Sequence, residues 1–145
     1  MVHRALAEAI ALFESGLSSC HRSEDRKLIE GYVAELGFVL AGAVMGKDVL
    51  RRLPRIERQF GQSWLIDPQP FEPAFAKWHE FKRQYEEFAV RGLTVNERLH
   101  AFSLAERYDQ AAAAGDLDEV TRILEAVHVD AGSIAGILGK IGNKV

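Results

Sequence analysis

Apolar residues recur along most of this chain at spacings of three and four, which is the period of an α-helix with one buried face. The N-terminal stretch is an example, because it places Val2, Leu6, Ile10, Phe13 and Leu17 on one helical face. No stretch alternates apolar and polar residues in the way of a half-buried strand. The pattern predicts an all-α protein, a compact single-domain bundle of six or seven helices joined by short connections.

The second predicted helix runs from about Glu24 to Met45, and its later half is apolar nearly all round. A helix of that composition is normally buried on several sides. Gly37, Ala41 and Gly42 add little side-chain bulk, so another helix could approach closely. We predict a central core helix, with a self-association surface as the alternative.

Prolines mark the next boundaries. Pro54 falls inside an apolar-periodic segment, where a proline removes a backbone hydrogen bond and disfavours helix at the preceding Leu53. We therefore expect a break or kink there. The main loop is predicted from Gly61 to Pro70, because Asp67-Pro68-Gln69-Pro70 cannot continue a helix.

Most of the aromatic residues fall between Phe60 and Phe88. At about 100° per residue, those after Pro70 share one side of a helix, and we predict that this stripe is core. Trp64 lies before the stripe, in the predicted loop and without helical register. Packing is one interpretation of Trp64. The other is an anchor for a partner protein, since tryptophan is enriched at interaction hot spots. The residues of the stripe are Phe71, Phe75, Trp78, Phe81, Tyr85 and Phe88.

Capping residues mark helix starts in the C-terminal half. Thr94-Val95-Asn96-Glu97 matches a capping box, in which the Thr hydroxyl and the Glu carboxylate each accept a backbone N–H. The helix that follows is predicted to end near Gly115. Asp116 and Asp130 then stand at the start of two further predicted helices.

Length and charge narrow the class of protein. A chain of 145 residues has the usual size of one domain, so a single helical domain is predicted over residues 1–145. A net charge of −3 argues against a dedicated nucleic-acid binder, which usually has a strongly basic face. Cys20 is the single cysteine, so a buried or spare thiol is expected rather than a disulfide framework. The longest apolar run, from Leu36 to Gly46, is shorter than the roughly 20 residues that span a bilayer, and the cytoplasm is the expected location.

Two stretches resemble a known group of sequences. They are Arg58-Gln59-Phe60-Gly61-Gln62-Ser63-Trp64-Leu65-Ile66-Asp67 and Leu93-Thr94-Val95-Asn96-Glu97-Arg98-Leu99, the second followed by Ala114-Gly115-Asp116. Together they resemble a group of small bacterial helical proteins with no established function. The resemblance implies a cytoplasmic bacterial protein and carries over no catalytic residue.

Candidate chemistry is sparse. Arg122 and His128 form an Arg-x5-His pattern similar to that of the HEPN ribonucleases, in which the pair acts around attack by a 2′-hydroxyl. Two Glu-x-x-His pairs, Glu97/His100 and Glu125/His128, have the spacing of di-iron helices, but only a turn at Gly115 separates them. We expect no metal site and no cofactor.

An arginine face is the other charged feature. Arg51, Arg55 and Arg58 recur at spacings of four and three, opposite Leu53 and Ile56. Such a face could hold phosphate or the acidic surface of a partner. The plain alternative is a solvated face, since surface charges usually contribute little to stability.

The sequence therefore predicts a non-catalytic protein-binding module, of which an antitoxin or an immunity protein would be one form. Its partner is expected to be another protein, with a homodimer as one arrangement and with no role for membrane or nucleic acid. The competing hypothesis is a HEPN-like ribonuclease that uses Arg122 and His128. The predicted partner-binding residues are Trp64, Asp67, Arg51, Arg55 and Arg58.

Overall fold

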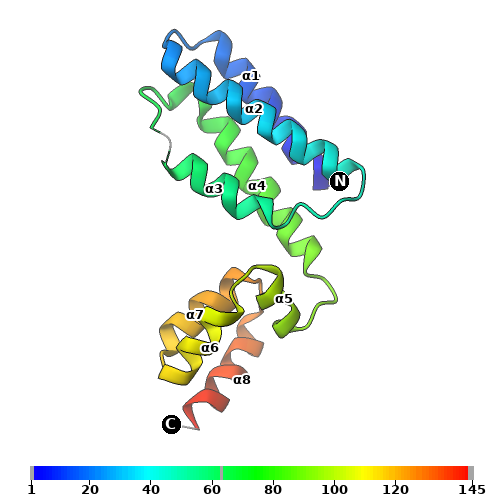
Figure 1. Ribbon diagram of the computed structural model, residues 1–145, viewed down its shortest axis with the longest axis vertical. Helices are drawn as coiled ribbons and strands as arrows, with labels where there is room; N and C mark the ends of the chain where they lie inside the picture. Colours follow the sequence, from blue (N-terminus) through cyan, green and yellow to red (C-terminus); the bar gives the residue numbers. More distant parts are fainter. Residues whose placement is uncertain (1, 63, 144–145) are drawn as a thin grey trace. The chain divides into compact units, whose positions relative to one another are not determined.

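The computed structural model describes residues 2–62 and 64–143, and every regular element in that part of the chain is helical (Figure 1). The prediction of an all-α protein is confirmed. The elements are α1 (Val2–Ser18), α2 (Ser23–Val44), α3 (Arg52–Gln62), the 3₁₀ turn η1 (Gln69–Phe71), α4 (Glu72–Ala89), α5 (Val95–Ala101), α6 (Ala105–Ala114), α7 (Leu117–Ala126) and α8 (Ala131–Gly142).

The described residues form eight α-helices rather than six or seven, because the helix expected from Thr94 to Gly115 is broken. Ser103 adopts a left-handed backbone conformation with φ of 58°. The N–H of Leu104 then donates to the carbonyl of Leu99 at 2.8 Å, and the N–H of Ser103 donates to His100 at 3.1 Å. These bonds end α5 with the left-handed cap that glycine usually supplies.

The helices form two compact units, Met1–Tyr85 and Glu86–Val145, and the division falls inside α4. The second unit has a buried apolar cluster of its own, which includes Leu99, Val120 and Leu124. A single domain over residues 1–145 stays a prediction, and each unit is described by itself.

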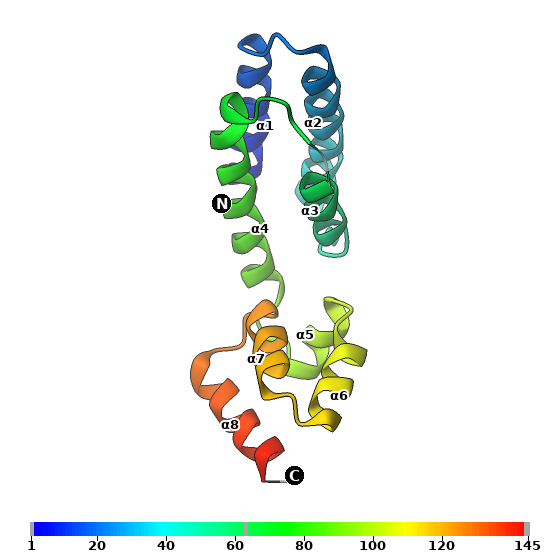
Figure 2. The ribbon, with the colours of Figure 1, turned by 90° about the vertical axis from the view of Figure 1, so that its left-hand side faces the viewer.

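In the first unit α1 packs along α2, and Figure 2 shows α4 beside α1 and α3 beside α2. Aromatic rings from all four helices meet between these pairs. The Tyr32 and Phe60 ring centroids are 4.5 Å apart, and those of Phe13 and Phe75 are 5.1 Å apart in an edge-to-face arrangement. Trp78 is fully buried and completes the cluster against Phe60.

The predicted aromatic stripe is core along most of its length. Phe71, Trp78 and Phe81 are fully buried and Tyr85 is buried, although Phe71 belongs to η1 rather than to α4. The prediction was wrong for Phe88, which is 57% exposed. Phe88 lies beyond Tyr85, the last residue of the first unit, so the core of that unit does not extend to it.

Gly16 permits a close approach between α1 and η1. A Cβ at this position would lie 2.6 Å from Cδ1 of Phe71 and 2.8 Å from the carbonyl oxygen of Pro70. No side chain fits at those distances. Gly16, inside α1, therefore allows η1 to pack directly on the helix.

The prediction that the second half of α2 is buried on several sides was wrong. Phe38 is 71% exposed and Met45 is 72% exposed. One side of the helix packs on its neighbours, and the other side is left to solvent. The buried side consists of Asp25, Ile29, Tyr32, Leu36, Val39 and Ala43.

Proline 54 lies in the first turn of α3, since the helix begins at Arg52. A first-turn backbone nitrogen has no acceptor within the helix, so the missing N–H of proline costs little there. The prediction of a break or kink at Leu53 was wrong, because Leu53 is itself helical and the non-helical connection ends before Arg52. The non-helical connection that precedes α3 is fixed in part by the backbone N–H of Val49, which donates to the Tyr85 hydroxyl at 3.2 Å.

The predicted helix starts of the second unit are confirmed. Thr94 and Glu97 form the capping box that opens α5. The side chains of Asp116 and Asp130 accept backbone N–H groups at the starts of α7 and α8. In the first unit, Cys20 is a buried free thiol, the first of the two expected alternatives. None of the described helices is both long enough and apolar enough to cross a lipid bilayer.

Candidate functional site

Trp64 is the most exposed large apolar side chain described, with 87% of its surface accessible to solvent. It lies in the connection between α3 and η1, as the sequence predicts. Ile66, two residues later, is also exposed, whereas Leu65 between them is half-buried. The structure therefore excludes Trp64 from the core and leaves an indole and an aliphatic side chain on one short loop.

A buried carboxylate fastens this loop to the first unit. Both carboxylate oxygens of Asp25 accept backbone N–H groups, from Ile66 at 2.8 Å and from Asp67 at 2.9 Å. Asp25 is fully buried in the first turn of α2, where the helix dipole favours negative charge. A buried charge is tolerated only when it is hydrogen-bonded, so this arrangement holds the backbone directly after Trp64 in one place.

Asp67 helps to shape the loop. Its side chain accepts the backbone N–H of Gln69 at 3.3 Å, while its own N–H is bound by Asp25. The Asp67 side chain is exposed. The structure thus places Asp67 beside the indole-bearing segment, with a local hydrogen bond that a loop aspartate commonly forms.

A shallow groove of about 430 Å³ opens beside Trp64. One wall is fixed by Glu57, whose carboxylate accepts the indole N–H of the buried Trp78 at 2.7 Å. The same carboxylate lies 3.5 Å from Nδ1 of His79 on α4. The groove is mainly apolar, and its lining residues are Glu57, Phe60, Gly61, Trp64, Leu65, Pro68, Phe75 and His79.

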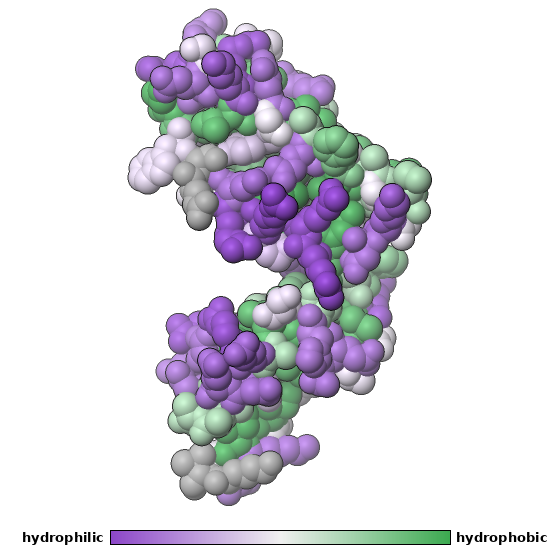
Figure 3. Space-filling view, viewed as in Figure 1, coloured by the Kyte–Doolittle hydropathy of each residue, from purple (hydrophilic) through white to green (hydrophobic). Residues whose placement is uncertain are grey.

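Arginines lie on the exposed side of α3, a helix that also contributes Glu57, Phe60 and Gly61 to the groove, and Figure 3 shows hydrophilic residues over that helix. Arg51 precedes the helix, and Arg55 and Arg58 lie on it; all three are exposed. Arg52, at the first position of α3, is exposed as well. Within the described residues none of these guanidinium groups forms an ion pair. The structure therefore brings the predicted arginines and Trp64 onto consecutive segments of one unit.

Arg122 and His128 are bound to different carboxylates. Arg122 is exposed on α7 and pairs with Glu119 at 3.1 Å. Nε2 of His128 lies 3.0 Å from the buried carboxylate of Glu86, and the backbone carbonyl of His128 accepts a guanidinium N–H of Arg98 at 2.8 Å. These contacts give His128 a structural role in joining the turn after α7 to the start of the second unit.

The Glu-x-x-His pairs do not assemble a metal site. The carboxylate of Glu97 already serves as a helix cap. Its pKa is lowered, mainly by the hydrogen bond from the backbone N–H of Thr94 and secondly by the hydrogen bond with the Thr94 hydroxyl. His128 is turned to Glu86. Among residues 2–62 and 64–143, no group of three or more His, Cys, Asp or Glu side chains gathers in a way that could hold a metal ion.

Asp25 is not among the residues that the sequence predicts to have a functional role. A clue was present in the spacing. Asp25, Ile29, Tyr32 and Leu36 follow one another at intervals of four and three, which places the aspartate on the buried side of α2. A carboxylate in that register needs donors from another segment.

Comparison with known proteins does not identify the function of this surface. The chain matches no protein-family model, no curated protein and no solved structure. Its function is therefore inferred from the chemistry of the loop, the groove and α3.

Proposed function

We propose that this protein is a non-catalytic protein-binding module, and that its partner docks on the Trp64 surface. This surface consists of Trp64 and Ile66, the groove beside them, and Arg51, Arg55 and Arg58. The observation that carries the proposal is an indole with 87% of its surface exposed on a loop fastened by the buried Asp25.

The fastening of the loop matters for affinity. Ordering a loop and its side chains is one of the costs of association, and a surface that is already fixed loses less freedom on binding. Tryptophan offers a large contact area with few rotatable bonds, and it dominates many interfaces. Trp64 combines both properties, because the backbone of the next residues is held to α2.

The positive charge of three arginines favours a partner with an acidic surface. Arg51, Arg55 and Arg58 are exposed without ion pairs among the described residues, so they are available to carboxylates. Arginine binds carboxylates with two parallel hydrogen bonds, and it is enriched at hot spots beside tryptophan. The expected partner is a protein segment that places an apolar side chain in the groove and acidic residues against α3.

A displayed library of short peptides, selected on the immobilised full-length chain, tests this proposal. Selected sequences should contain an apolar residue flanked by acidic residues. Trp64→Ala should weaken their binding by about 30-fold or more, which is the effect of losing a hot-spot side chain. Thermal stability should be unchanged, because the indole is exposed. Arg55→Glu combined with Arg58→Glu should also weaken binding, through charge repulsion.

Phe88→Ala provides the matched control, since Phe88 is an exposed aromatic outside the Trp64 surface. Its peptide binding should equal that of the native chain. Selected peptides that bind Trp64→Ala as tightly as the native chain would contradict the proposal. So would a selection in which acidic residues are not enriched.

A further inference from the structure

The exposed side of α2 carries a continuous stripe of residues with the spacing of a coiled-coil seam. Intervals of four and three alternate along it, which is the heptad pattern that lets two helices pack along their length. All members of the stripe are exposed, and its central residues are apolar. They are Lys27, Gly31, Ala34, Phe38, Ala41 and Met45.

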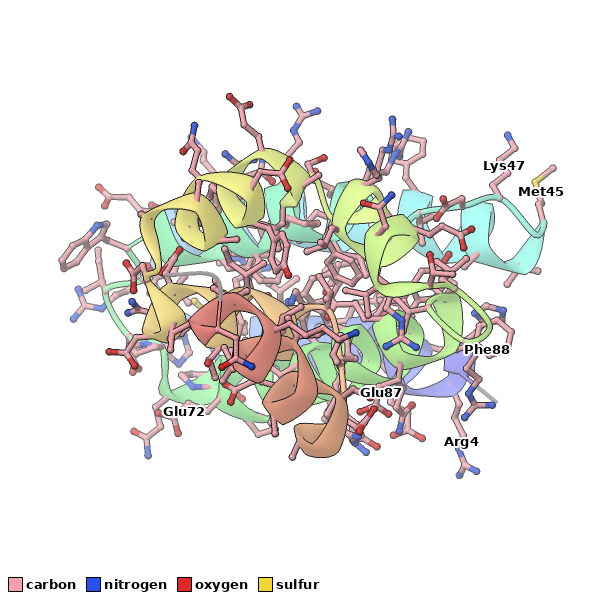
Figure 4. The ribbon with its side chains drawn as sticks, turned by 90° about the horizontal axis from the view of Figure 1, so that it is seen from below. Arg4, Met45, Lys47, Glu72, Glu87 and Phe88 are labelled. Atoms are coloured by element: carbon pink, nitrogen blue, oxygen red, sulfur yellow. The ribbon has the colours of Figure 1, made fainter. Side chains whose placement is uncertain are left out.

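Large and small side chains alternate along this α2 stripe. Phe38 and Met45 project into solvent, whereas the space above Gly31 is open, because no side chain or other segment lies within 4 Å of the position that a Cβ would take. Met45 and Lys47 point away from the rest of the chain in Figure 4. A helix laid on this stripe could place a bulky residue over Gly31.

The two ends of the stripe carry complementary charges. Glu24 and Glu30 lie toward its N-terminal end, on either side of Lys27. At the other end, Lys47, Asp48 and Arg52 line a hollow of about 240 Å³ together with Phe38 and Met45. Within the described residues, Glu24, Glu30, Lys47 and Arg52 have no ion-pair partner.

We propose that this face is the interface of a homodimer, in which α2 of a second copy packs antiparallel on α2 around a two-fold axis near Phe38. The antiparallel direction turns the end of the stripe that carries Glu30 toward Lys47, in the connection that follows α2 of the second copy. The same register seats Met45 over Gly31 of the second copy. In a parallel pairing, each charged residue would instead face the same residue of the second copy, and like charges would repel.

The seam of such an interface runs along the second half of α2. With the two-fold axis near Phe38, the two α2 helices overlap from Tyr32 to Val44, which is 13 residues or about 20 Å. A two-fold interface uses the same patch on both copies and must be self-complementary. The α2 stripe meets that requirement in residue size and in charge.

Sedimentation equilibrium of the full-length chain tests the proposal. The native chain should be a dimer in reversible equilibrium with monomer, and Phe38→Glu should raise its dissociation constant by about 30-fold or more. Phe38 is 71% exposed, so circular dichroism should show an intact fold. Trp64→Ala is the control and should dimerise like the native chain, which separates this interface from the Trp64 surface.

Charge reversal tests the antiparallel register. Glu30→Lys and Lys47→Glu should each weaken the dimer, and the double variant should recover most of the loss. Disulfide trapping gives a second check: Phe38→Cys should cross-link to its own copy, whereas Met45→Cys should not.

A chain that remains monomeric at the highest concentration reached overturns the proposal and leaves this face to a different protein. A dimer that Phe38→Glu does not weaken, or an assembly larger than a dimer, also overturns it. Failure of the double charge reversal to recover association, or efficient cross-linking of Met45→Cys, rejects the antiparallel arrangement.

Discussion

At the scale of single residues, Asp25 shows how one carboxylate sets the position of a distant segment. Its hydrogen bonds reach Ile66 and Asp67, far along the chain. Local interactions such as the Thr94–Glu97 capping box could be predicted from the sequence, because both partners lie within one helical turn. The burial of Asp25 could not be predicted in the same way, because it depends on a segment about forty residues away.

Asp25→Asn should lower the free energy of unfolding by about 2 kcal/mol. The amide oxygen of asparagine can still accept one backbone N–H, but the amide nitrogen cannot accept the other, so one buried N–H loses its hydrogen bond. Hydrogen exchange at the Ile66 and Asp67 amides should accelerate. Chemical denaturation and hydrogen exchange measure the two effects. Asp116→Asn is the control, since asparagine is an equally good N-cap at that exposed position. Unchanged exchange at both loop amides would contradict the proposed fastening.

At the scale of elements, helix type and approximate bounds followed from periodicity, but two features did not. Ser103 ends α5 in a left-handed conformation for which serine gives no strong sequence indication. The exposed side of α2 looked like core because its small and apolar residues resemble a buried helix. Composition alone does not distinguish a helix covered by its own chain from one that presents an apolar stripe to solvent.

Gly16 and Gly37 provide opposite outcomes for the same substitution. Alanine normally stabilises a helix relative to glycine by about 1 kcal/mol. At Gly16 the new methyl would overlap Phe71 and Pro70, and overpacking costs roughly 1–3 kcal/mol, so Gly16→Ala should destabilise the protein. At Gly37 the added Cβ would have no side chain or other segment within 4 Å, so Gly37→Ala should stabilise the protein. Urea denaturation midpoints measure both, and a midpoint that rises for Gly16→Ala would show that η1 does not pack on α1 as described.

At the scale of the whole molecule, the division at Tyr85 and Glu86 was hidden from the sequence. The apolar periodicity of α4 runs through this point as far as Phe88, so the pattern gives no indication that the residues on either side belong to different units. Chain length alone favours one domain. Two compact units become visible only when each residue's neighbours in space are known.

Leu124→Ala should distinguish the two units. Leu124 is fully buried in the apolar cluster of the second unit, and truncation of such a residue costs about 2–5 kcal/mol. Native-state hydrogen exchange should show loss of protection in α6 to α8, with protection in α1 to α3 retained. Leu36→Ala, in the buried side of α2, should show the reverse. Equal loss of protection throughout the chain would mean that the protein unfolds as one cooperative body.

The contrast between the two tryptophans has an optical consequence. Trp78 is enclosed and its indole N–H is bound to Glu57, whereas Trp64 is surrounded mostly by water. Native fluorescence is therefore the sum of a shielded, blue-shifted component from Trp78 and a solvent-relaxed component from Trp64. Loss of the fold changes chiefly the first component, and a molecule that covers the loop changes chiefly the second. The chain thus carries separate intrinsic reporters of its folding and of its surface.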